Sequence, residues 1–288
     1  MTHLSDELIH TTVRIETWDE SGNAYTGTGF FFDFEFIGGK VVPMLVTNRH
    51  VLRGMSQAAL HMTRESDGGT PIFGRHTRLI IQNLQARVLY HPDESTDLAL
   101  LMVGDTISEN RKNGTPLHYK AVSPTHILSP DSAGILTAIE EVLMIGYPNS
   151  LWDGVNNLPI VRRGVTATPV ERDYEGRAEF VIDAACFPGS SGSPVFLYNE
   201  IALSRESGRP ILQRRFGLLG VLYAGPQHTV EGTIIVESIP TAVRSVPISR
   251  IPMNLGFCVK AHRILDFMPQ LWDRIQESAR RGGTGPRS

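Results

Sequence analysis

Residues 188–193 of this chain read Pro-Gly-Ser-Ser-Gly-Ser, and an apolar segment lies on each side of them, at 180–182 and 194–196. Gly189 can adopt backbone angles that a side chain forbids, so its N–H can point into a cavity. With Ser191 as the nucleophile, the N–H groups of residues 189 and 191 could form a two-donor oxyanion hole for acyl transfer. A Gly/Ser hairpin turn without chemistry has a similar composition, so this loop alone does not decide between the two interpretations.

A histidine and an aspartate also stand at the ends of apolar segments. His50 follows the segment 41–46, and Asp97 comes directly before the segment 98–103. Asp93 lies in the same polar loop, but only Asp97 adjoins the apolar segment, so Asp97 is the preferred candidate. The order His, Asp, Ser along the chain is, among the well-known arrangements of this triad, that of the chymotrypsin-type double barrel.

Neighbouring residues of the same types are weaker candidates. Ser190 and Ser193 flank Ser191, and only Ser191 has glycine at both −2 and +1. Five further histidines stand in loops or polar segments, where we expect them on the surface: His61, His76, His91, His126 and His228. Cys258 and His262 are four residues apart, but a metal site needs more ligands at close spacing. We therefore expect no metal and no cofactor.

Composition excludes several classes of function. The 288 residues carry a net charge of −3, which gives no electrostatic case for a nucleic-acid or membrane partner. Two cysteines do not make a disulfide scaffold and fit a reducing compartment. Residues 1–7 lack a basic start and an apolar core, so we expect no signal peptide and a cytoplasmic location.

Short apolar segments separated by Gly and Pro predict an all-β protein. Residues 104–134 collect Gly, Pro, Ser and Asn and mark a boundary between two halves. The segment 53–75 is expected to be an excursion with one short strand at 58–62. Apolar residues at helical spacing predict an amphipathic helix over 261–280, with a kink or interruption at Pro269.

Eight short blocks stand in a fixed order along the chain: residues 27–30, 47–51, 97–101, 145–148, 163–166, 183–185 with 188–192, 219–221 and 256–257. Together these blocks resemble the trypsin-like, chymotrypsin-fold serine peptidases, and among them the protease domain of the HtrA/Deg group. Their collinear order makes the resemblance more specific than any one block.

The resemblance implies two six-stranded antiparallel β-barrels followed by a C-terminal α-helix. The expected organisation is an N-terminal barrel with His50 and Asp97 (1–125), a C-terminal barrel with Ser191 (126–259), a packed helix (260–280) and a disordered tail (281–288).

The family's mechanism makes Ser191 the nucleophile of a serine endopeptidase, His50 the general base and Asp97 the residue that orients the imidazole. The oxyanion hole would be the backbone N–H groups of Gly189 and Ser191. The residue six before the nucleophile, Ala185, would form the base of the primary pocket, which suggests cleavage after small or medium apolar residues. The edge strand for the substrate backbone would comprise Val221, Leu222 and Tyr223.

The sequence also departs from the family pattern. Ser193 stands where a second glycine is usual, no PDZ-like stretch follows the protease body, and residues 198–215 and 226–250 are longer than the pattern requires. The basic residues within 205–215 are expected to be a solvated loop. The competing hypothesis is therefore a protease-fold binding protein that is catalytically silent or that a regulatory protein partner activates. The sequence does not indicate an oligomeric state.

Overall fold

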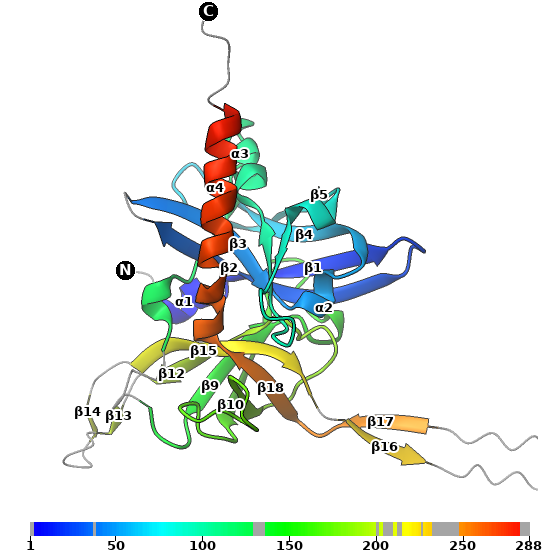
Figure 1. Ribbon diagram of the computed structural model, residues 1–288, viewed down its shortest axis with the longest axis vertical. Coiled ribbons are helices and arrows are strands. Elements are labelled where there is room, and N and C mark those ends of the chain that lie inside the picture. The colour runs from blue at the N-terminus through cyan, green and yellow to red at the C-terminus, as the bar shows by residue number, and fades with distance from the viewer. Residues whose placement is uncertain are drawn as a thin grey trace, which may run out of the picture.

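The computed structural model describes residues 3–36, 39–128, 136–199, 202–203, 210–211, 215–225, 227–231 and 248–282. The two largest β-sheets are built one from the N-terminal half of the chain and one from the C-terminal half (Figure 1). The mostly-β, chymotrypsin-like fold predicted from the sequence is thus confirmed.

The N-terminal sheet has eight strands, in the order β5-β4-β1-β2-β3-β7-β6, with β8 paired to β4. We expected six strands in a barrel. Within the described residues the pairing instead runs as an open path that ends at β5 and β6. The strands are β1 (Thr12–Asp19), β2 (Ala24–Phe36), β3 (Lys40–Thr47), β4 (Met55–Glu65), β5 (Pro71–Ile81), β6 (Val88–Tyr90), β7 (Ala99–Met102) and β8 (Leu117–His118).

The C-terminal sheet closes into a barrel of six strands, in agreement with the expectation for this half. Around the barrel these are β10 (Ile160–Thr166), β11 (Glu179–Asp183), β18 (Leu255–Lys260), β15 (Arg215–Ala224), β12 (Pro194–Asn199) and β9 (Glu141–Gly146). Two further antiparallel pairs join β13 (Ala202–Leu203) to β14 (Pro210–Ile211) and β16 (Gln227–Glu231) to β17 (Ile248–Pro252).

Short helices connect and flank the two sheets. They are α1 (Leu4–Leu8), α2 (Arg49–Leu52), α3 (Gly104–Lys112), α4 (Met268–Gly282), and the 3-10 turns η1 (Leu84–Arg87), η2 (Pro124–His126), η3 (Pro148–Ser150) and η4 (Ala261–Phe267). The sequence did not predict α3, because Ile107 is its one buried residue and leaves no apolar periodicity to detect. The excursion predicted at 53–75 is also wrong, since β4 and β5 form a long hairpin there.

The C-terminal helix begins later than predicted. Residues 261–267 form the 3-10 turn η4, and α4 starts at Met268. Pro269 lies in the first turn of α4, where its missing N–H would have no acceptor within the helix. The proline therefore sits at the start of the helix rather than kinking one that runs from 261.

Three clusters of buried apolar side chains hold these elements together. One lies within the N-terminal sheet and one lies within the barrel. The third cluster connects the two halves, because alternate phenylalanines of β2 face the barrel and the C-terminal segment. Phe31, between them, faces the cluster within the N-terminal sheet. Members of this third cluster include Phe30, Phe32, Phe34, Phe196, Ile264 and Phe267. Each fully buried Phe contributes about 1.5–3 kcal/mol relative to exposure.

Several sequence-based expectations fall on residues that the structure does not describe. Much of the two insertions lies outside the described residues, and so does the tail from residue 283. The proposed boundary after residue 125 falls within η2. In the part of the chain that is described, no helix is both long and apolar enough to cross a membrane.

Candidate active site

His50 and Asp97 come from neighbouring strands of the N-terminal sheet. β3 and β7 are antiparallel partners, and Thr47 lies opposite Ala99 in their register. His50 follows β3 within α2, and Asp97 precedes β7, so this pairing brings both residues to the same end of the sheet.

Two hydrogen bonds fix the carboxylate of Asp97 against His50. The distance between His50 Nδ1 and Asp97 Oδ2 is 2.6 Å, and the backbone N–H of His50 donates to Oδ1 at 3.0 Å. A carboxylate only accepts hydrogen bonds, so Nδ1 carries a proton, and in a neutral imidazole Nε2 is then the acceptor. Asn48 Nδ2 donates to the backbone oxygen of Asp97 at 2.8 Å and holds the loop beneath the pair. The His50 side chain is 49% exposed, which leaves Nε2 accessible.

Ser191 lies between β11 and β12, in residues 184–193, which we call the serine loop. Its Oγ donates to the backbone oxygen of Tyr223 at 3.5 Å. Among the hydrogen bonds of the described residues, none joins Ser191 Oγ to His50. The structure therefore brings His50 and Asp97 into contact but leaves the serine hydroxyl turned toward β15. A bond of 3.5 Å is at the weak limit, so it restrains the hydroxyl only weakly.

The N–H groups of Gly189 and Ser191 each point away from the carbonyl oxygen of the preceding residue, and both of those oxygens accept hydrogen bonds. The oxygen of Pro188 accepts from the Asn149 N–H at 2.5 Å, and the oxygen of Ser190 accepts from the Ser193 N–H at 3.0 Å. In a trans peptide the C=O and the following N–H point in opposite directions. Neither N–H has an acceptor among the described residues, so both are available to a developing oxyanion.

Two glycines make this loop conformation feasible. Gly189 and Gly192 have φ of +87° and +88°, which L side chains rarely adopt. A Cβ at residue 189 would lie 2.6 Å from the Tyr147 oxygen, and one at residue 192 would collide with the Thr28 oxygen. Both positions therefore require glycine on grounds of φ and of space.

Thr28 on β2 ties the serine loop to the N-terminal sheet. Its N–H donates to the Ser191 oxygen at 2.8 Å, and its Oγ1 donates to the Gly189 oxygen at 2.9 Å. The same Oγ1 accepts from the Tyr147 N–H at 3.1 Å. The first two bonds hold the loop against β2 at residues 189 and 191, and the third fixes the Thr28 hydroxyl to the residue that follows β9. Sequence reasoning used Thr28 as part of a family block but did not assign this contact.

The serine loop accommodates Ser193 at the position where the family usually has a second glycine. Its φ is outside the left-handed region, and its side chain is fully buried. The Ser193 Oγ occupies the space that a Cβ on Gly146 would need. The departure from the family pattern is therefore accommodated by a glycine on the facing strand, β9.

The predicted substrate-binding residues occupy different environments. Ala185 and Tyr223 are partly exposed, whereas the side chains of Val221 and Leu222 lie in the core. The N–H and C=O of Leu222 are bonded to Ser193 and Gly192. Substrate binding by these residues stays a prediction, and any role of 221 and 222 is through backbone placement.

The Tyr223 side chain, though partly exposed, is held by residues of the barrel. Its hydroxyl donates to Glu179 Oε2 at 2.8 Å, and its ring lies 6.4 Å from that of Phe257. Burial, together with the Glu179 carboxylate, raises the pKa of the Tyr223 phenol. The ring is therefore held by β11 and β18, while the backbone oxygen faces Ser191.

Residues 91–98, which we call the aspartate loop, are held by charged side chains that the sequence did not single out. Arg49 Nη2 donates to the His91 oxygen at 2.6 Å, and Arg263 Nη2 donates to Asp93 Oδ2 at 2.8 Å. The distance between His91 Nε2 and Asp266 Oδ2 is 3.2 Å. Two residues of the C-terminal segment η4 thus hold the loop that carries Asp97 through side-chain contacts. Because Arg263 and Asp266 lie some 170 positions along the chain from the loop, no local signal could have revealed this contact.

Asp93 is a structural residue of this loop. Hydrogen bonds from the Ser95 hydroxyl and N–H lower the pKa of Asp93 to about 2, and Thr96 and Arg263 add to the effect. The preference for Asp97 over Asp93 as the partner of His50 is consistent with this arrangement.

The expectation of surface histidines is wrong for His61 and His91, which are 9% and 2% exposed. His91 is buried between Asp93 and η4, where its ring nitrogens find polar partners. His76 and His126 are partly exposed, and the side chain of His228 lies outside the described residues.

Comparison with known proteins defines the class of protein. The model of the trypsin-like peptidase domain family matches residues 27–200, more than half of the chain. The chain belongs to this family. A similar solved structure is that of the Rv3671c protease from M. tuberculosis in its active form, with 17% identity, a TM-score of 0.41, and coverage of 91% of this chain and 80% of that one. No curated protein matches the chain in sequence.

Proposed function

We propose that the protein is a serine endopeptidase that cleaves protein or peptide substrates through Ser191, His50 and Asp97. The observation that carries the proposal is the pairing of His50 with both carboxylate oxygens of Asp97, on the same molecule as a serine loop with two free N–H groups. Membership of the trypsin-like peptidase family supports it.

In the proposed reaction His50 Nε2 takes the proton of Ser191 Oγ as that oxygen attacks the peptide carbonyl carbon. The N–H groups of Gly189 and Ser191 donate to the oxyanion, and each such donor is worth about 3–4 kcal/mol in related enzymes. His50 then gives the proton to the leaving amine, and water hydrolyses the acyl-enzyme by the same steps in reverse.

A fluorophosphonate probe tests this proposal, because it needs only an activated serine and a formed oxyanion hole. We expect the wild type to be labelled and Ser191→Ala to be unlabelled. Ser190→Ala is the matched control, since the Ser190 side chain is buried and its Oγ has no hydrogen-bond partner. Labelling that disappears in Ser190→Ala but persists in Ser191→Ala would overturn the assignment.

A second candidate function is a binding protein that stays silent until a partner completes the site. The bond from Ser191 Oγ to the Tyr223 oxygen, rather than to His50, favours it. A folded wild type that is unlabelled alone but labelled in the presence of a regulatory protein would establish this alternative. Labelling of the isolated protein would exclude it.

We propose a preference for small or medium apolar residues before the cleaved bond. Ala185 is partly exposed and carries no charge that would select Lys or Arg. Profiling with a peptide library tests this preference, and Ala185→Asp should gain cleavage after Lys or Arg. If that variant keeps the wild-type profile, residue 185 does not lie at the base of the pocket.

A cytoplasmic location remains part of the proposal. Both cysteines are free and buried, and burial raises the pKa of the Cys186 thiol to about 11. Free thiols persist in reducing compartments. Fractionation of the cells that make the protein tests this, and recovery in a secreted or membrane fraction would contradict it.

A further inference from the structure

β5 arches away from β4 at one end of the N-terminal sheet. Thr63 lies opposite His76, and Glu65 lies opposite Pro71, so the single residue Arg64 faces four residues of β5. The excess residues form a wide bulge that cannot follow the ladder. Gly74, at φ +75°, allows the chain to turn within it.

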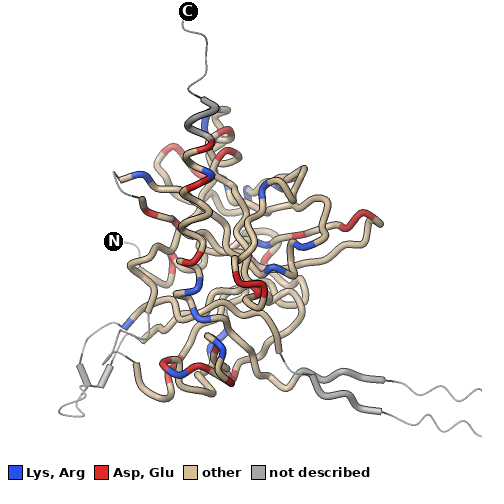
Figure 2. Tube along the Cα trace, viewed as in Figure 1, with Lys and Arg blue, Asp and Glu red and all other residues tan. Residues whose placement is uncertain are grey.

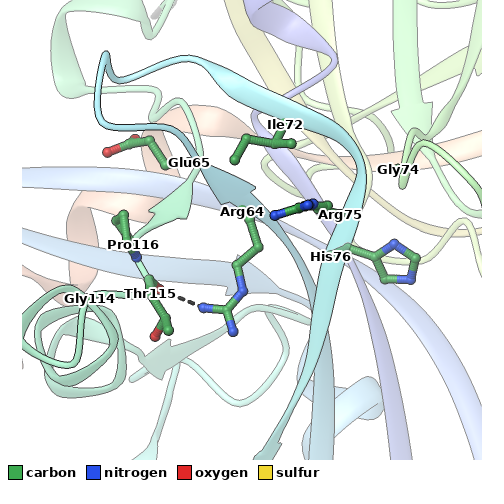
Figure 3. A pocket seen from close by; sticks show the side chains of 9 residues that line it. All are labelled: Arg64, Glu65, Ile72, Gly74, Arg75, His76, Gly114, Thr115 and Pro116. Atoms are coloured by element: carbon green, nitrogen blue, oxygen red, sulfur yellow. Dashed lines mark hydrogen bonds between the residues drawn. The ribbon is translucent and has the colours of Figure 1, made fainter.

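The arch opens a groove of roughly 490 Å³. One wall is the arch, residues 72–76, and the other is the segment 114–116 that follows α3. The end of β4 forms the floor. In Figure 3 the side chain of Arg75 points across the groove toward Arg64, whose guanidinium extends to Thr115.

The groove carries positive charge that no carboxylate balances. Arg64 Nη1 donates to the Thr115 oxygen at 2.7 Å, and Arg75 is exposed. Neither arginine has an ion-pair partner among the described residues. Glu65 also lines the groove, but its carboxylate is shared by Arg111 and His118, each at 3.5 Å.

The backbone of the arch is also unpaired. β5 is the edge strand of the sheet, and residues 72–75 have no partner on β4 either. Their N–H and C=O groups can therefore accept an added extended chain, as exposed sheet edges do in peptide recognition. A strand added here would bring its side chains beside the two arginines.

This groove is separate from the candidate active site. Arg64 lies nine positions beyond Met55, where β4 begins just after α2, so the strand places it roughly 30 Å from that end. A long substrate could occupy both places at once.

We propose that this groove is a docking site for an acidic, extended polypeptide segment, whose carboxylates pair with Arg64 and Arg75. Guanidinium groups bind carboxylates through paired, charge-assisted hydrogen bonds, and two arginines line this groove. Its role in presenting substrates rests on the proposed peptidase function, but binding itself does not depend on catalysis.

The test uses the full chain with Ser191→Ala, so that the peptide is not cleaved. The probe is a fluorescent twelve-residue peptide of alternating Glu and Val, and anisotropy measures its binding at low and high salt. We expect saturable binding that weakens with salt. Arg75→Glu and the double variant Arg64→Gln/Arg75→Gln should each weaken it about tenfold or more.

Arg172→Gln is the matched control, because Arg172 is exposed and does not line the groove. It should bind like the parent. Arg75 makes no hydrogen bond among the described residues, so Arg75→Glu should fold even if the double variant does not. Unchanged binding by Arg75→Glu, no binding by the parent, or equal binding of an alternating Lys-Val peptide would overturn the proposal. Equal binding of a single-stranded oligonucleotide would overturn the assignment to polypeptide. If the peptide binds while the fluorophosphonate fails to label the wild type, the docking site stands and the proposed activity does not.

Discussion

The serine loop is held by backbone hydrogen bonds, whereas the aspartate loop is held largely by charged side chains. Ser191 and Gly192 are fixed through the N–H of Thr28 and the oxygen of Leu222, both within the ladder region of the sheets. The aspartate loop depends on Arg49, on Arg263 and on the contact of His91 with Asp266.

The two kinds of support respond differently to conditions. Backbone bonds between buried strands do not titrate and are little affected by salt. The ion pairs of the aspartate loop are partly exposed, with the Asp93 side chain 46% exposed, so salt screens them. In the described part of the trace, Lys/Arg and Asp/Glu are interspersed (Figure 2), so no single-sign field from these residues overrides the local contacts. We infer that the geometry of the candidate site depends on salt through the aspartate loop and not through the serine loop.

The largest loss of activity is expected from a substitution of Asp97, the residue of the aspartate loop that contacts His50. Asp97→Asn removes the acceptor that holds the His50 tautomer, and kcat should fall about 10³–10⁴-fold, as in the chymotrypsin template. The rate of peptide cleavage measures this. Asp67→Asn is the control, since Asp67 is exposed in the turn between β4 and β5 and is not part of the aspartate loop. A loss below tenfold for Asp97→Asn would mean that Asp97 does not orient the imidazole.

The serine loop has one side-chain support that can be removed cleanly. Thr28→Val keeps the shape but loses the bonds from Oγ1 to Gly189 and from Tyr147 to Oγ1. Because the oxyanion donors would be less well placed, kcat should fall about ten- to a hundredfold with KM unchanged. Thr26→Val is the matched control on the same strand, since the Thr26 hydroxyl is hydrogen-bonded to Ser150 and, among the described residues, not to the serine loop. If both variants behave alike, the backbone bonds alone position the loop.

Removing the contacts between η4 and the aspartate loop should lower kcat by a smaller factor. Arg263→Gln removes its bonds to Asp93 and Thr96, and kcat should fall up to about fivefold, the equivalent of about 1 kcal/mol for a partly exposed ion pair. Raising the salt should reduce the wild-type rate but leave the variant nearly unchanged. Arg163→Gln, which breaks an exposed pair with Glu141 elsewhere, is the control. An equal response of both variants to salt would contradict the proposed grip.

The smallest effect is a difference in acid stability between the two sheets. Burial lowers the pKa values of His10, His61 and His118, all in the N-terminal half, and that of His10 falls to about 4. Between pH 6.5 and about 4 the unfolded chain binds more protons than the folded chain, so the stability falls as the pH falls through this window. Urea unfolding at several pH values measures it. His10→Gln should show a shallower pH dependence, and an unchanged slope would contradict the assignment.

The sequence located the candidate residues because each stands at the end of a local apolar segment. His50, Asp97 and the glycines of the serine loop are recognisable within a few positions of a strand. The strand pairing that brings His50 to Asp97 was implied only through the resemblance, and the structure gives its physical basis in the register of β3 with β7.

Other features depend on residues distant in the sequence and could not be predicted. The grip of Arg263 on Asp93 spans the whole second half of the chain. The arch of β5 arises from a mismatch in strand pairing, which has no signature in the apolar pattern. The length of β5 itself was missed because its exposed, charged residues hide the strand periodicity.

The contact between Ser193 and Gly146 limits how this family member can change over evolutionary time. The space between β9 and the serine loop accommodates one small side chain, now supplied by Ser193. A side chain at position 146 would require a smaller residue at position 193 and a shift of the Thr28 side chain, whose Oγ1 would lie 2.8 Å from the new Cβ. We therefore expect the two positions to co-vary among related chains, so that the shared volume is inherited while the residue that fills it is exchanged.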